Sequence, residues 1–249
     1  MKPIHKFEPG GYRFLEGGFP FCQGVAAEAG HEIVRARFRC VTPLAAGFAA
    51  IERHLKSLGR PLTALCAAEL RSPVPFTLEG FRAFNTGYVD VLKAWGLYRD
   101  KLNPVARSNR APVLEPPAEP GFFAFSYTVP AAPGAPRTFV IAGNGDCPEG
   151  GRIPEDIVRR GETTPDAVRE KAGHVAGKME ARMRALGADW RDATAVHVYT
   201  ALDVGAAAAE LMDRGFSGLG FNWFYVRPPI VGLELEMDMR GVRTEIVLD

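Results

Sequence analysis

The order of apolar and polar residues repeats once along this chain. Apolar side chains at helical spacing run through residues 42–58, and a second such stretch covers residues 164–186. Each stretch opens on Thr-Pro, stops at a glycine and is followed by a strand-like run, at 64–70 and 193–200. A hydroxyl cap, an early proline and a terminal glycine are the ordinary start and stop signals of a helix. The duplicated pattern predicts two similar halves.

The remaining segments complete the same plan. Further strands are predicted at 20–27, 33–41, 122–129, 138–143, 230–238 and 242–248, and further helices at 78–95 and 204–213. The first half therefore has the order β-β-α-β-α-β. Residues 130–137 are mostly Pro and Ala with nothing to bury, which predicts an extended linker. We expect an α+β protein with one unit at 1–129 and another at 138–249.

Each predicted unit has a sheet covered by two helices on one face only. An uncovered apolar sheet face needs a partner. We therefore expect the two halves, or several chains, to pack around each other. Concave surfaces form where such units meet, so ligand sites are expected at the seams.

Composition narrows the function classes. The chain has 249 residues, of which 47% are hydrophobic and 24% charged, as in ordinary globular proteins. A net charge of +1 without a Lys/Arg cluster gives no reason to expect nucleic acid as a partner. No apolar run is long enough for a bilayer, and the first residues lack a signal-peptide core. We expect a cytoplasmic protein with no membrane partner.

Cysteine and histidine give no sign of a metal site. The four cysteines form no Cys-x-x-Cys pair, and no Cys/His cluster has zinc-type spacing. Cys40 and Cys66 lie in apolar strand-like runs and are predicted to be buried thiols. For the scattered histidines, structural or solvent-facing roles are favoured; they are His5, His31, His54, His174 and His197.

The predicted strand at 33–41 alternates apolar residues with Arg35, Arg37 and Arg39. This period of two is typical of a strand with one exposed face. A solvated sheet face or edge is favoured over an anion-binding stripe.

One short segment could carry chemistry. Asn103-Pro-Val-Ala-Arg107 follows a predicted helix, fixes the backbone and then projects a single guanidinium. The rigid donor fork of Arg suits bidentate binding of a carboxylate. On composition alone, a surface salt bridge is the favoured alternative for Arg107.

At this point the chain resembles a known family. The segment Pro-Phe-Cys-Gln-Gly-Val at 20–25, the helix end at Leu58-Gly59 and Pro-Val-Ala-Arg at 104–107 are similar to the RidA/YjgF reactive intermediate deaminases. The second half resembles the same family independently, through 139–143 and the closing strand at 243–247. The resemblance covers nearly the whole chain as two tandem copies.

The resemblance implies a fold and a chemistry. The fold would be two chorismate-mutase-like (RidA-type) α+β units, each a mainly antiparallel sheet with two helices on one face, in a homo-oligomer, usually a trimer. The activity would be hydrolysis of an enamine or imine carboxylate, of 2-aminomuconate or 2-aminoacrylate type, with release of ammonia and no cofactor. Arg107 matches the arginine that holds the substrate carboxylate, and Phe21 and Cys22 would border the planar substrate.

The two copies depart from the family pattern differently. In the second copy Ile230 stands at the arginine position, and Arg227 could substitute only if the loop shifts. The second copy keeps Glu245 where the first has Phe122. Glu245 is either a strand-end carboxylate or a group that orients water or acts as general acid. We therefore expect one type of working cleft per chain, bordered by the first copy.

Two alternatives stay open. One is a chorismatase-like enzyme, because those proteins also resemble tandem versions of this fold. The other is a non-catalytic regulator that binds small carboxylates. The missing second arginine, and a phenylalanine at position 21 where the family has tyrosine, favour the regulator.

Overall fold

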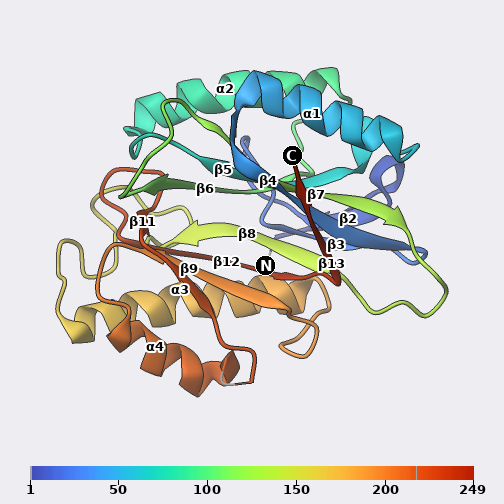
Figure 1. The fold of residues 1–249 in the computed structure, drawn as a ribbon. Coiled ribbons are helices and arrows are strands. Elements are labelled where there is room, and N and C mark those ends of the chain that lie inside the picture. Colours follow the sequence, from blue (N-terminus) through green and yellow to red (C-terminus); the bar gives the residue numbers. More distant parts are fainter. Residues whose placement is uncertain (1, 217) are drawn as a thin grey trace.

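A computed structural model describes residues 2–216 and 218–249. Two sheets lie between two layers of helices (Figure 1). Helices α1 (Leu44–Ser57) and α2 (Leu78–Ala94) cover one sheet, and α3 (Pro165–Ala185) and α4 (Gly205–Leu211) cover the other. The expected α+β class, with two sheets and four helices, is confirmed for the described residues. None of these helices combines the length and apolar character needed to cross a membrane.

The sheet under α3 and α4 has seven strands. In spatial order they are β1 (Ile4–Phe7), β2 (Tyr12–Leu15), β3 (Gly24–Ala27), β8 (Phe139–Gly145), β12 (Leu235–Gly241), β9 (Ala195–Thr200) and β10 (Asn222–Phe224). The sheet under α1 and α2 has six. They are β11 (Val226–Arg227), β6 (Ala106–Pro112), β5 (Leu65–Arg71), β7 (Gly121–Pro130), β4 (His31–Pro43) and β13 (Thr244–Leu248).

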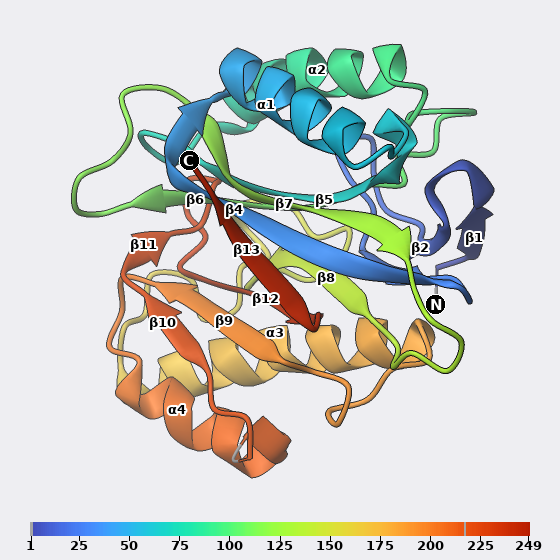
Figure 2. The same ribbon diagram turned by 45° about the vertical axis from the view of Figure 1, so that its right-hand side comes forward.

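Each sheet contains strands from both halves of the chain. Strand β3 of the first half pairs with β8, aligning Val25 with Val140. In return, β13 at the C-terminus pairs in parallel with β4, aligning Ile246 with Ala36, and Figure 2 shows it lying along that strand. The two halves therefore exchange strands, and the division into units at 1–129 and 138–249 stays a prediction.

Several predicted boundaries are wrong for identifiable reasons. Thr164 caps α3 as expected, accepting from the Ala167 N–H at 3.3 Å. Thr42 does not cap α1, because β4 continues to Pro43 and that proline is the N-cap. Residues 106–112, for which no strand was predicted, form β6 because they pair in parallel with β5. Strand β12 begins at Leu235 rather than at residue 230, after a turn in which Gly232 has φ +99°.

Apolar packing fills the space between each sheet and its helices. The buried apolar residues on α1 and α2 include Phe48, Ile51, Leu55, Tyr88 and Leu92. Those on α3 include Val168, Ala172, Val175, Met179 and Met183. Cys66 is buried as predicted, whereas Cys40 is exposed. The prediction failed at Cys40 because the pairing of β4 with β7 shifts register between Arg37 and Thr42.

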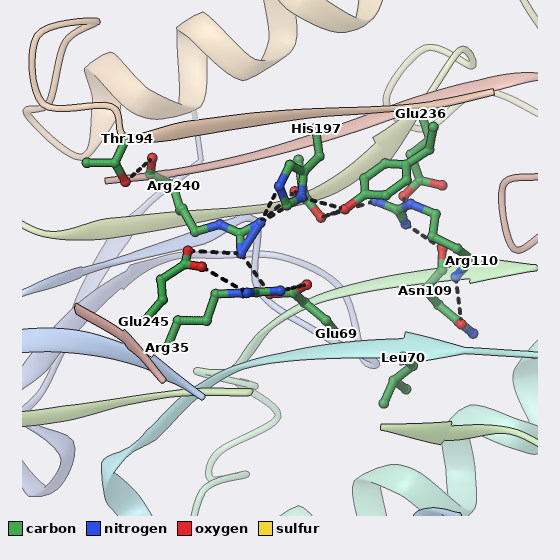
Figure 3. Close-up of polar contacts among 12 residues, drawn as sticks. Arg35, Glu69, Leu70, Asn109, Arg110, Thr194, His197, Glu236, Arg240 and Glu245 are labelled. Carbon is green, nitrogen blue, oxygen red and sulfur yellow. Dashed lines mark hydrogen bonds and ion pairs between the residues drawn. The ribbon is translucent and has the colours of Figure 1, made fainter. Parts of the chain in front are cut away.

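The surfaces that the two sheets turn toward each other carry charge. We call eight residues the inter-sheet charge network: Arg35, Glu69, Arg110, His197, Tyr199, Glu236, Asp238 and Arg240. Figure 3 shows most of them between the strands of the two sheets. Glu69 on β5 accepts from Arg35 at 2.6 Å and from Arg240 of the other sheet at 3.0 Å. The expected solvated arginine row is therefore wrong at Arg35, which is 5% exposed.

We predict that Glu69→Gln destabilises the protein by about 3 kcal/mol, because it removes the charge that pairs two buried guanidinium groups. Urea unfolding followed by circular dichroism measures the change. The matched control is Glu245→Gln. Glu245 also contacts Arg35, at 3.1 Å, but its side chain is 46% exposed, so about 1 kcal/mol or less is expected. Equal losses of unfolding free energy in the two variants would contradict the argument that the stabilising effect of these ion pairs depends on burial.

Candidate active site

A cleft of about 760 Å³ opens where the two halves meet. Phe21 and Gln23, just before β3, form one side together with Phe81 of α2. The end of β8 and the loop that follows it, through residue 153, form another side. Arg182 of α3 and Glu236 of β12 also line it. The cleft therefore gathers polar groups from the seven-stranded sheet and from α3, and α2 of the other layer contributes the aromatic ring of Phe81.

Glu236 is the buried carboxyl group of this cleft. It is 4% exposed, and its Oε1 accepts from Arg110 Nη1 at 2.9 Å. A Cβ at position 143 would lie 2.3 Å from that Oε1, so only glycine leaves room for the carboxyl group beside β8. Burial raises the pKa of Glu236 to about 7; Arg110 lowers this pKa and Asp238 raises it. Glu236 can thus gain or lose a proton near neutral pH.

Asp238 lies two residues further along the same face of β12. Its pKa is shifted downward, whereas that of Glu236 is shifted upward. Burial alone would raise the pKa of Asp238, but the hydrogen bond and charge of His197, with the charges of Arg110 and Arg240, hold the pKa well below its usual range. Tyr199 also donates to Asp238, at 2.9 Å. Arg110 therefore faces one carboxylate that stays ionised and a second, Glu236, that titrates. Pairs of this kind are typical of acid-base sites.

Arg107, on β6, stands directly behind the cleft wall. It is 2% exposed, and its Nη2 donates to Asn85 Oδ1 at 2.6 Å. Aromatic rings surround the guanidinium, and two of them, Phe21 at 5.0 Å and Phe81 at 5.5 Å, line the cleft. Within the described part of the chain, Nη1 is buried without a hydrogen-bond partner. Burial lowers the pKa of Arg107 to about 10. The alternative of a surface salt bridge is therefore wrong.

Arg182 is a second buried arginine at the same cleft. It extends from α3, and its Nη2 donates to Asn144 Oδ1 at 2.9 Å. Its Nη1 is buried and has no hydrogen-bond partner among residues 2–216 and 218–249. Gln23, which also lines the cleft, donates to Glu149. One guanidinium group with a free donor thus lines the cleft, and a second lies behind its wall.

Sequence reasoning missed both Glu236 and Arg182. The signal for Glu236 was present, because residues 235–240 alternate Leu, Met and Met with Glu, Asp and Arg. Such alternation inside a buried strand places charge on one face. Arg182 gave no signal, because an arginine in the last turn of a helix is ordinary.

The structure separates the residues that the sequence proposed. Phe21 lies at the cleft with Arg107 behind it, and Cys22 is buried next to Phe21, its Sγ 3.4 Å from the Pro104 carbonyl oxygen. Burial raises the pKa of the Cys22 thiol, so it stays protonated. Arg227 is exposed on β11, and Glu245 lies on β13 beside Arg35; neither lines the cleft. Functional roles for these two residues stay predictions without support from their positions.

Among the described residues, no group of three or more His, Cys, Asp or Glu side chains could hold a metal ion. The cleft lining carries a titrating carboxyl group, one guanidinium group and side-chain amides, and the guanidinium group of Arg107 lies behind its wall.

Comparison with known proteins agrees with a deaminase resemblance. Residues 4–246 match the model of a family described as 2-aminomuconate deaminase CnbZ. The 2-amino-5-chloromuconate deaminase of Comamonas testosteroni is 47% identical over 246 residues, which is 97% of this chain and 98% of that protein.

Two solved structures are among those similar to this chain. The YjgF gene product of E. coli has 17% identity and a TM-score of 0.31, covering 43% of this chain and 80% of that one. A chorismatase has 14% identity and a TM-score of 0.46, covering 88% and 77%. The family match spans nearly all of the sequence, and on that ground this chain belongs to the 2-aminomuconate deaminase CnbZ family.

Proposed function

We propose that this protein hydrolytically deaminates an enamine carboxylate of 2-aminomuconate type. One observation carries the proposal: the carboxyl group of Glu236, with a pKa of about 7, lies at a cleft with Arg107 close behind its wall. Membership of the family and the 47% identical chloromuconate deaminase support the same activity.

Arg107 supplies the charge that holds the substrate. Its Nη2 is fixed by Asn85, which leaves Nη1 to donate to a substrate carboxylate. Phe21 is half-buried and turns aside to admit that carboxylate, while Phe81 packs against the planar conjugated chain. A charge-assisted hydrogen bond in a buried site is stronger than one in water and also fixes the orientation.

Glu236 moves the protons. In its neutral form it protonates the enamine carbon, so that a C–H bond forms from the C=C electrons and the carbon bearing nitrogen becomes an iminium. The resulting carboxylate then takes a proton from water as its oxygen bonds to that carbon. Glu236 next donates that proton to the nitrogen and takes the hydroxyl proton as the C=O bond forms and the C–N bond breaks, so ammonia leaves, a 2-oxo acid remains and Glu236 is neutral again. Acid, base and water suffice for these steps, so the proposal includes no cofactor.

The direct test is release of ammonia. We expect the purified protein to convert freshly generated 2-aminomuconate into ammonia and a 2-oxo dicarboxylate well above the spontaneous rate. Enzymatic determination of ammonia, with loss of the absorbance of the conjugated enamine, measures this. Carboxylates that raise the melting temperature without any turnover would instead favour a binding regulator and overturn the proposal.

We expect Arg107→Lys to lower kcat/KM about a hundredfold, because the charge stays while the donor fork is lost. Steady-state kinetics on 2-aminomuconate provides the measurement. Arg227→Lys is the matched control: it makes the same chemical change at an exposed arginine outside the cleft lining and should leave kcat/KM unchanged. An equal loss in both variants would argue against Arg107 as the group that binds the carboxylate.

Protonated Glu236 starts the reaction, so kcat/KM should fall as the pH rises through about 7. Glu236→Gln should lower kcat/KM by roughly 10²–10⁴-fold and remove this dependence. Profiles of kcat/KM between pH 5 and 9 test both statements. Glu245→Gln, at a carboxylate outside the cleft, should keep the wild-type profile. A wild-type slope that persists in Glu236→Gln would assign the titration to another group.

A further inference from the structure

We propose that Arg182 binds the second carboxylate of the substrate and so makes this site selective for conjugated dicarboxylates over monocarboxylates. This inference deepens the proposed function and rests on it. Arg107 would hold the carboxylate next to the reacting carbon, and Arg182 would hold the carboxylate at the far end.

Arg182 is held in position from one side only. Asn144 accepts from its Nη2 and donates its own amide N–H to the Gly145 carbonyl oxygen at 2.7 Å, which fixes the amide orientation. The other terminal nitrogen, Nη1, is buried and unbonded within the described residues. A buried donor without a partner is destabilising, and an acceptor on a ligand would remove that cost.

The guanidinium group of Arg182 has no ion-pair partner among the described residues. Arg182 is 8% exposed, yet no carboxylate of the described chain lies within 4 Å of its nitrogens. Among the acidic side chains, Glu149 has the largest effect on the pKa of Arg182, but its hydrogen-bond partner is the amide of Gln23. Lys178 adds positive charge nearby: burial and then Arg182 lower the pKa of its ammonium to about 8. A buried cation of this kind favours an anionic ligand.

Arg107 and Arg182 approach Glu236 from different elements, β6 and α3. Phe21 packs on Arg107, and two residues later Gln23 lines the cleft together with Arg182. Cys22, between them, pairs with Ala106, the residue before Arg107, and its thiol feels the charge of Arg182. Glu236 influences the pKa of both guanidinium groups. A planar chain with a carboxylate at each end could therefore contact both arginines with its reactive carbon near Glu236.

A purely structural role is the alternative. In that case Arg182 would only support Asn144 and the end of β8, and its loss would weaken every ligand equally. A pair of stable ligands separates the two roles. Muconate (hexa-2,4-dienedioate) and sorbate (hexa-2,4-dienoate) share six carbons and the conjugated diene, and they differ only in that a methyl group replaces the second carboxylate.

The experiment is isothermal titration calorimetry of muconate and sorbate with the wild type, Arg182→Gln and Arg184→Gln. We expect the wild type to bind muconate roughly 10–100-fold more tightly than sorbate, as one charged hydrogen-bonded pair allows. In Arg182→Gln the preference should fall below about twofold, with sorbate affinity unchanged. Arg184, exposed on the same turn of α3, is the matched control and should keep the wild-type preference.

Equal affinity of the wild type for the two ligands, binding of neither, or an undiminished preference in Arg182→Gln would overturn the inference. If circular dichroism shows that Arg182→Gln is unfolded, Arg182→Lys replaces it. That variant keeps the charge without the fork, and a preference equal to wild type in it would likewise overturn the inference. Deamination of 2-aminomuconate without any preference for muconate would support the proposed function and overturn the inference about Arg182. A preference for muconate that depends on Arg182, without deamination, would support the inference about binding and contradict the proposed function.

Discussion

The two sheets meet through charged side chains, and Arg110 is the contact on which the site depends. It extends from β6 of one sheet and reaches two carboxylates on β12 of the other, Glu236 at 2.9 Å and Asp238 at 3.3 Å. One guanidinium cannot fully compensate two buried carboxylates. Asp238 has His197 and Tyr199 as further partners and stays ionised, whereas Glu236 has none of these. The difference in partners is what leaves Glu236 with a pKa of about 7 at the cleft.

The two halves of the chain contribute different residues to the cleft and its surroundings. The strand exchange places β3 beside β8 and β13 beside β4, so residues far apart in the sequence share one interface. Arg107 comes from the first half, and Glu236 and Arg182 come from the second. Each half therefore supplies a different part of the cleft. That the two halves are diverged copies of one unit stays a prediction.

Much of the local structure was predictable. Helical spacing located α1, α2 and α3 closely, because a helix is stabilised by contacts within a few residues, and the predicted hydroxyl cap is confirmed at Thr164 of α3. The motif that ends at Arg107 singled out an arginine that lies behind the cleft wall, although composition alone had favoured a surface salt bridge for it. Errors arose where pairing between distant segments decides the outcome. Strand β6 exists because it pairs with β5, and Arg35 is buried because a second sheet covers it.

By itself, the sequence determined the α+β class, the main helices, the family resemblance and the candidacy of Arg107. Those depend on local spacing and on short motifs. Only the tertiary structure decided that Glu236 titrates near neutral pH, that Glu245 lies outside the cleft and that Arg182 lies at it. The physical reason is that the pKa of a group, and whether a buried donor has a partner, depend on the surroundings of that group in the folded protein. Burial, Arg110 and Asp238 set the pKa of Glu236, and Gly143 leaves room for its carboxyl group. These residues lie on three strands, β6, β12 and β8.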